Sequence, residues 1–131
     1  MIGLDTNVLV RYIMQDDARQ ALLADRLIES LSVEAPGFVS LVTVVELVWV
    51  LSSAYGLTDV KVAEGLETLL RTREIRVDQA ETVWKALRDF QGARADFADC
   101  LIAQTGRIAG CETTMTFDRE AAKLDGMTRL D

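Results

Sequence analysis

The 131-residue chain contains no histidine. This absence excludes every mechanism that needs an imidazole, among them Ser-His-Asp and Cys-His nucleophiles and His-ligated zinc. Its two cysteines, Cys100 and Cys111, are too few and too poorly spaced for a structural zinc site, so we expect reduced thiols. The longest apolar-rich run, residues 39–51, is too short to span a bilayer and is interrupted by polar side chains such as Glu46. We therefore expect a soluble, cytoplasmic protein.

Proline occurs once and glycine eight times, which leaves no room for a low-complexity linker. Apolar residues make up 50% of the chain and can bury a real core, so a disordered protein is excluded. The length predicts a single domain over residues 1–131. The net charge of −7 argues against a broad basic surface that grips nucleic acid, but it is compatible with a metal site built from carboxylates.

Predicted strands and helices alternate along the chain. The apolar run at residues 1–4 predicts a buried strand, followed by a turn at residues 5–7. Further strands are predicted at residues 38–40, 75–77, 111–116 and 127–130. Helices are predicted at about residues 17–31, 41–55, 59–72, 79–90, 96–109 and 118–124, with Asp78 capping the fourth of them. This alternation predicts an α/β fold: a three-layer α/β/α sandwich with a short central parallel sheet.

Two acidic residues follow predicted strands. Asp5 comes after residues 2–4, and Asp118 comes after residues 113–117. Ligands of open parallel sheets bind at the carboxyl ends of the strands, which favours a functional role for both. Each also has a local alternative, because Asp5 or Asn7 can hold an Asx turn and Asp118 can cap a helix. Taken singly, both interpretations stay open.

Glu46 lies in an unusually apolar predicted helix. Within residues 41–51 only Thr43 and Glu46 are polar, so we expect this helix to be mostly buried. A glutamate there must be paired or bound to a ligand, unless it lies with Thr43 and Ser53 on a narrow solvent-exposed stripe of the helix. The apolar surroundings favour the functional interpretation, a paired or ligated glutamate.

Asp96 and Asp99 are three residues apart near the start of a predicted helix, which places both carboxylates on one face. Asp96 has a ready alternative as the helix N-cap. Asp99 is harder to explain in that way, because apolar residues follow it closely.

A shared pocket for these carboxylates requires a cation. Two unit charges about 4 Å apart repel by about 4 kcal/mol at an effective dielectric constant of about 20. Oxygen ligands without His or Cys favour Mg²⁺ or Mn²⁺ over zinc. Such a metal site suits hydrolysis of phosphodiesters, in which the metal activates water and stabilises charge on phosphate oxygens.

Four blocks of the sequence, residues 4–11, 44–51, 95–103 and 114–118, resemble the PIN-domain family in order and spacing, and specifically VapC-type toxins of prokaryotic toxin–antitoxin pairs. The resemblance implies a PIN fold and a Mg²⁺- or Mn²⁺-dependent endoribonuclease. The residues that match the family's acidic positions are Asp5, Glu46, Asp99 and Asp118, with Asp96 as a supporting metal ligand. By the same resemblance, Thr6 and Asn7 would orient Asp5.

The resemblance further implies an RNA substrate, a homodimer, and a cognate VapB-like antitoxin that holds the enzyme inactive. Because the carboxylate pocket is negative, we expect the partner to insert an Arg or Lys into it. Two alternatives remain open from the sequence. One is a housekeeping PIN nuclease in RNA processing, and the other is a PIN-like interaction module without catalysis.

Overall fold

The computed structural model describes all residues from Met1 to Asp131. The strands are β1 (Ile2–Gly3), β2 (Gly37–Val39), β3 (Ile75–Val77), β4 (Thr114–Thr116) and β5 (Met127–Arg129). The α-helices are α1 (Thr6–Met14), α2 (Ala18–Glu29), α3 (Leu41–Trp49), α4 (Asp59–Arg71), α5 (Ala80–Gly92) and α6 (Phe97–Ile108). A π-helical turn, η1 (Val50–Ala54), continues α3, and a 3-10 turn, η2 (Ala121–Lys123), lies between β4 and β5. The chain divides into two compact units, residues 1–78 and 79–131. The expectation of one domain over residues 1–131 stays a prediction.

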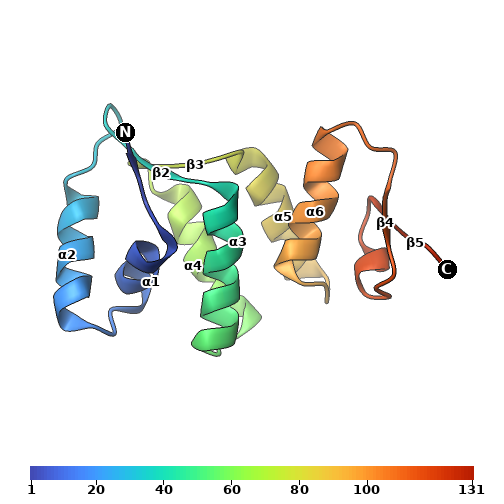
Figure 1. Ribbon diagram of the computed structural model, residues 1–131, viewed down its shortest axis with the longest axis horizontal. Helices are drawn as coiled ribbons and strands as arrows, with labels where there is room; N and C mark the ends of the chain where they lie inside the picture. Colours follow the sequence, from blue (N-terminus) through green and yellow to red (C-terminus); the bar gives the residue numbers. More distant parts are fainter. The chain divides into compact units, whose positions relative to one another are not determined.

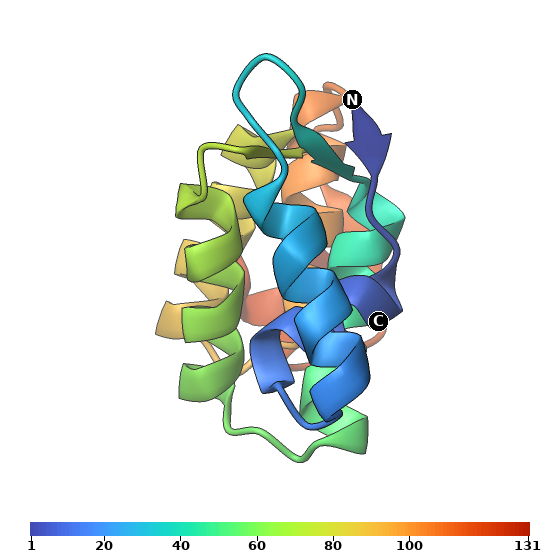
Figure 2. The same cartoon turned by 90° about the vertical axis from the view of Figure 1, so that its left-hand side faces the viewer.

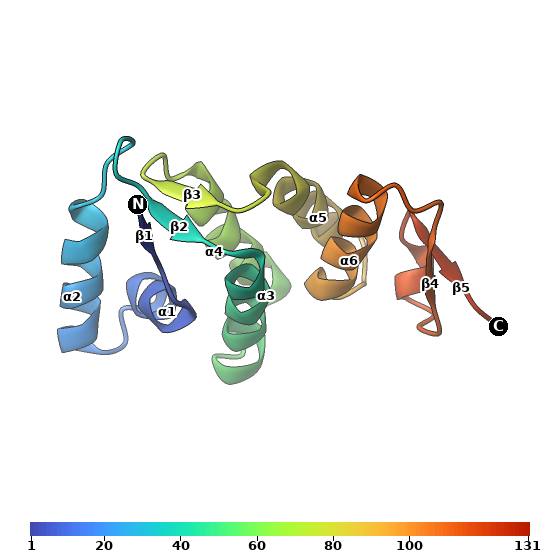
Figure 3. The ribbon, with the colours of Figure 1, turned by 45° about the horizontal axis from the view of Figure 1, so that its top comes forward.

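The first unit is built around a parallel three-stranded sheet in the order β1-β2-β3 (Figure 3). Ile2 pairs with Gly37, and Gly37 pairs in turn with Ile75. Val39, Ile75 and Val77 are buried, as expected for strands covered by helices. The prediction that the first strand is buried was wrong, because β1 lies at the edge of the sheet and both its residues are exposed. Helix α1 packs against α2 and α3, and α4 packs against β3 (Figure 1). The loop between α2 and β2 projects beyond the ends of these helices (Figure 2).

Helix α1 was missing from the sequence prediction, which placed only a turn after the first strand. Its residues Thr6, Val8 and Val10 are β-branched and have modest helix propensity. Tertiary packing overrides that preference, since Leu9 and Val10 are buried in the core. As a result, the carboxyl end of β1 leads directly into a helix.

The sequence predicted that the apolar helix over residues 41–51 is mostly buried, and for one face of α3 this prediction was wrong. Val44, Leu47 and Val48 of α3 are buried, but Val42 is 78% exposed and Trp49 is 64% exposed. The helix therefore has an apolar face turned to solvent. The hydrophobic pattern alone could not separate this face from the core face, because both carry large apolar side chains.

The second unit pairs α5 with α6 and adds a parallel two-stranded sheet of β4 and β5. Phe90 of α5 and Phe97 of α6 meet edge to face, with ring centroids 6.0 Å apart. The prediction that Asp78 caps α5 was wrong. Gln79 occupies the N-cap position, in a left-handed conformation and without a side-chain cap, and the backbone N–H of Asp78 donates to the carbonyl of Val39 over 2.8 Å.

The helices are all too short or too polar to cross a membrane.

Candidate active site

Asp5 lies at the junction between β1 and α1. It is the N-cap of α1, and its Oδ1 atom accepts a hydrogen bond from the backbone N–H of Thr6 over 2.8 Å. Asp5 therefore does have the local role that the sequence allowed, a side-chain bond to a nearby backbone N–H. The side chain is exposed and its Oδ2 atom has no hydrogen-bond partner, so the same carboxylate is also available to a ligand.

Thr6 connects this carboxylate to Glu46. The Thr6 side chain is buried, and its hydroxyl donates a short hydrogen bond to Oε1 of Glu46 on α3. The Thr6 residue thus contacts both acids, Asp5 through its backbone and Glu46 through its side chain. The resemblance implied that Thr6 orients Asp5; the backbone N–H of Thr6 does bond that carboxylate, and its side chain bonds Glu46 in addition.

Glu46 is exposed, as in the alternative of a solvent-exposed stripe, and it is paired with Thr6. Together with Asp5, Thr6 and Asn7 it lines a cavity of about 360 Å³ within the first unit. The other lining residues are Val10, Arg11, Val50, Ala54 and Tyr55. The structure therefore brings together the four site residues predicted in the first half of the chain.

The second unit holds the remaining predicted acids. Asp99 is half-buried in the first turn of α6, and its pKa is raised above the ordinary value, first by desolvation and then by the charges of Asp96 and Asp118. Three carboxylates from α6 and the segment after β4 thus share one electrostatic environment.

Capping was the local alternative for both Asp96 and Asp118, and the structure shows it only for Asp118. Asp96 occupies the N-cap position of α6, but its side chain makes no capping hydrogen bond, so the capping explanation for this residue fails. Asp118 does cap a turn, because its Oδ1 atom accepts from the backbone N–H groups of Glu120 at 2.8 Å and Ala121 at 3.0 Å. The remaining oxygen of Asp118 has no such partner.

The donor chemistry of both groups fits a hard dication. All candidate ligands are carboxylate oxygens. The pKa of Asp99 is raised first by desolvation and then by the charges of Asp96 and Asp118, and a cation would relieve the repulsion among these three carboxylates. Neither unit by itself brings three or more Asp, Glu or Cys side chains into an arrangement that could hold a metal ion. That all the acids share one site stays a prediction.

The family model of the PIN domain matches residues 2–127. The chain belongs to the PIN-domain family. Its parallel strands and six helices agree with the three-layer α/β/α fold predicted from the sequence. PIN domains are generally nucleases and typically use divalent metals. None of the curated proteins compared with the chain matches it.

Two further polar residues that line the cavity of this PIN domain, Arg11 and Tyr55, were not among the predicted site residues. Arg11 lies four residues after Asn7, one helical turn along α1. That spacing would have pointed to Arg11 if the helix itself had been predicted. Tyr55 had no signal of its own, because the π-helical turn Val50–Ala54 decides where it lies.

Replacing Asp99 with Asn is expected to stabilise the metal-free protein at neutral pH. A carboxyl whose pKa is raised by folding favours the folded state when protonated, and this contribution is lost as the pH rises through the raised pKa. The Asn variant should therefore have the higher Tm at pH 7 in EDTA, and its advantage should vanish below a pH of about 4, where Asp99 is protonated in both states.

Thermal unfolding followed by circular dichroism across this pH range measures the effect. Asp59→Asn, in the first turn of α4, is the matched control for charge at a helix N-terminus and should show no such gain. Equal Tm values for the parent protein and Asp99→Asn at pH 7 would contradict the prediction.

Proposed function

We propose that this PIN domain is a Mg²⁺- or Mn²⁺-dependent endoribonuclease and acts as the VapC-type toxin of a toxin–antitoxin pair. The observation that carries the proposal is the placement of the acids. Asp5 and Glu46 are both bonded by Thr6, and Asp99 has a pKa that is raised first by desolvation and then by the charges of Asp96 and Asp118. These residues stand in the sequence blocks that resemble VapC toxins. We include in the proposal that the metal is bound by acids of both groups, Asp5 with Glu46 and Asp99 with Asp96 and Asp118.

Asp5, Glu46, Asp99 and Asp118 would hold the metal, with Asp96 in support. A bound divalent ion supplies a nucleophilic water and stabilises charge on the phosphate oxygens. The residues of the chain prepare this site. Thr6 fixes Glu46 through its hydroxyl and Asp5 through its N–H group, so two acids keep their separation before any ligand arrives. A carboxylate that has an unbonded oxygen, as Asp5 has, can orient or deprotonate the attacking water.

We propose further that the protein forms a homodimer and is restrained by a small VapB-like antitoxin. The carboxylates that repel one another around Asp99 would attract a guanidinium or ammonium group. An arginine is the better inhibitor, since its planar fork can bond two carboxylate oxygens at once.

Incubation of purified protein with RNA is the experiment that tests the activity. We expect cleavage with Mg²⁺ or Mn²⁺, loss of cleavage in EDTA, and recovery when excess metal is added back. Cleavage that continues undiminished in EDTA would refute the metal dependence. Metal binding without cleavage of any RNA would favour the non-catalytic interaction module, and cleavage without growth arrest on expression would favour the RNA-processing nuclease.

A further inference from the structure

Arg11 is the only basic side chain that lines the cavity shared by Asp5 and Glu46. It lies on α1, and its side chain is 31% exposed. A cation beside candidate metal ligands has two possible tasks. It can balance the charge of the carboxylates, or it can contact an anionic substrate bound next to them.

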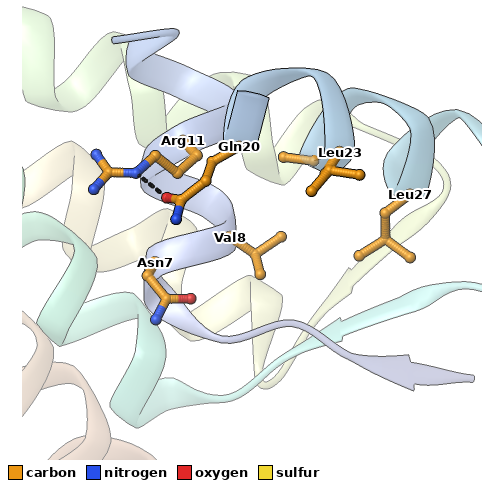
Figure 4. Close-up of a pocket in the computed structure, with 7 residues that line it drawn as sticks. Asn7, Val8, Arg11, Gln20, Leu23 and Leu27 are labelled. Atoms are coloured by element: carbon orange, nitrogen blue, oxygen red, sulfur yellow. Dashed lines mark hydrogen bonds between the residues drawn. The ribbon is translucent and has the colours of Figure 1, made fainter. Parts of the chain in front are cut away.

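The guanidinium of Arg11 is already paired with another acid, Asp16. Its Nη1 atom donates to both Asp16 carboxylate oxygens at 3.1 Å and to the Tyr55 hydroxyl at 2.9 Å. Its Nε atom donates to Oε1 of Gln20 over 2.7 Å, the bond drawn in Figure 4. Neither Asp5 nor Glu46 accepts a hydrogen bond from Arg11, so its pairing with Asp16, and not with these two carboxylates, holds the side chain in place.

The network also fixes the charge state of its members. The hydroxyl of Tyr55 donates to Oδ2 of Asp16 over 2.7 Å. This hydrogen bond, helped by Arg11, lowers the pKa of Asp16 against the opposing effect of desolvation. The same bond to Asp16, together with desolvation, raises the pKa of Tyr55. At neutral pH the network is therefore an ionised Asp16, a neutral Tyr55 and a cationic Arg11.

One end of the guanidinium remains free. The Nη2 atom of Arg11 has no hydrogen-bond partner, while Nε and Nη1 are held from three sides. The side chain is thus immobilised with two N–H donors to spare, so little rotamer entropy is left to lose when a ligand binds.

The backbone is shaped to hold this arrangement. Helix α3 passes into the π-helical turn η1, and the backbone N–H of Tyr55 bonds to the carbonyl of Val50 over 3.2 Å. π-helical turns are rare and frequently occur at functional sites. Here the turn delivers Tyr55 to Arg11, 44 residues away in the sequence.

We propose that Arg11 binds a backbone phosphate of the RNA next to the phosphate that is cleaved, with Asp16 and Tyr55 as positioning residues. The inference rests on the proposed function, because it assumes that RNA lies across the carboxylates. A guanidinium with two free N–H donors suits a phosphate better than any uncharged group. A backbone contact of this kind gives affinity and register without reading the base sequence.

The test measures RNA affinity in an Asp99→Asn background, in which the RNA should remain intact, over a range of salt concentrations. Arg11→Ala should weaken binding about tenfold or more, as loss of a hydrogen bond to a charged group does. It should also reduce the slope of log K against log salt by about 0.7, the value for one lost phosphate contact on a single strand. Arg11→Lys should keep the slope and still bind more weakly, because it retains the charge but not the fork.

Arg19→Ala is the control, since Arg19 is exposed on α2 and does not line the cavity. It should bind like the parent protein. If Arg11→Ala lowers the Tm but leaves affinity and slope unchanged, the network is only structural and this inference is wrong. If the protein with all its acids intact does not bind or cleave RNA, the proposed function fails and the inference fails with it.

Discussion

Replacing either Asp5 or Asp99 with Asn is expected to abolish RNA cleavage, whereas Asp96→Asn should only weaken it. Asn keeps the size of the side chain and removes the charge that a hard cation requires. The loss for Asp5 and Asp99 should exceed the roughly 10–100-fold cost that follows when a group supporting a metal ligand is lost.

The ranking follows from the different surroundings of the two acids on α6. Asp99 is half-buried, and desolvation and two neighbouring carboxylates raise its pKa. Asp96 is exposed and caps nothing, so its carboxylate is free but weakly constrained. A constrained ligand contributes more to a metal site than a mobile one, because less side-chain entropy is lost on binding.

Cleavage rates of the purified variants with Mn²⁺, together with calorimetric titration of the metal, test the ranking. Circular dichroism of each variant shows whether it remains folded. If Asp96→Asn lost the metal while Asp99→Asn kept it, the roles of the two residues would be exchanged.

The sequence predicted element positions well where a cap or a glycine marks the boundary. Asp17 caps α2 and Thr58 caps α4, next to the predicted helix starts at about residues 17 and 59. Prediction failed where packing overrides local preference. Helix α1 consists largely of β-branched and aliphatic residues, and only its contacts with α2 and α3 make it a helix.

The sequence predicted which acidic residues belong to the candidate site, but not the hydrogen bonds that hold the site together. Each acid stands at the end of an element or in an apolar helix, and these contexts are visible in the sequence. The bond between Thr6 and Glu46 joins residues 40 positions apart, and no local pattern reports it. The same applies to the network of Arg11, Asp16 and Tyr55, which depends on a π-helical turn that no sequence periodicity predicted.

Truncation of Leu47 to Ala is expected to lower the free energy of unfolding by about 2–5 kcal/mol, whereas Val42→Ala on the same helix should change it by no more than about 0.5 kcal/mol. Leu47 is fully buried, so its removal leaves a cavity that the surrounding core fills only in part. Val42 is 78% exposed and has no such cavity to leave.

Urea denaturation of both variants, with unchanged m-values, gives the comparison. The pair also decides between the structure and the sequence pattern, which predicted a helix buried nearly all round. If Val42→Ala destabilised the protein as much as Leu47→Ala, the outer face of α3 would be covered in solution, and the exposed position of Val42 would be contradicted.

Leu47 is next to Glu46 in the chain, so a cavity beneath α3 should also disturb the bond between Glu46 and Thr6. RNA cleavage by Leu47→Ala should therefore fall further than its folded fraction, and cleavage by Val42→Ala should not.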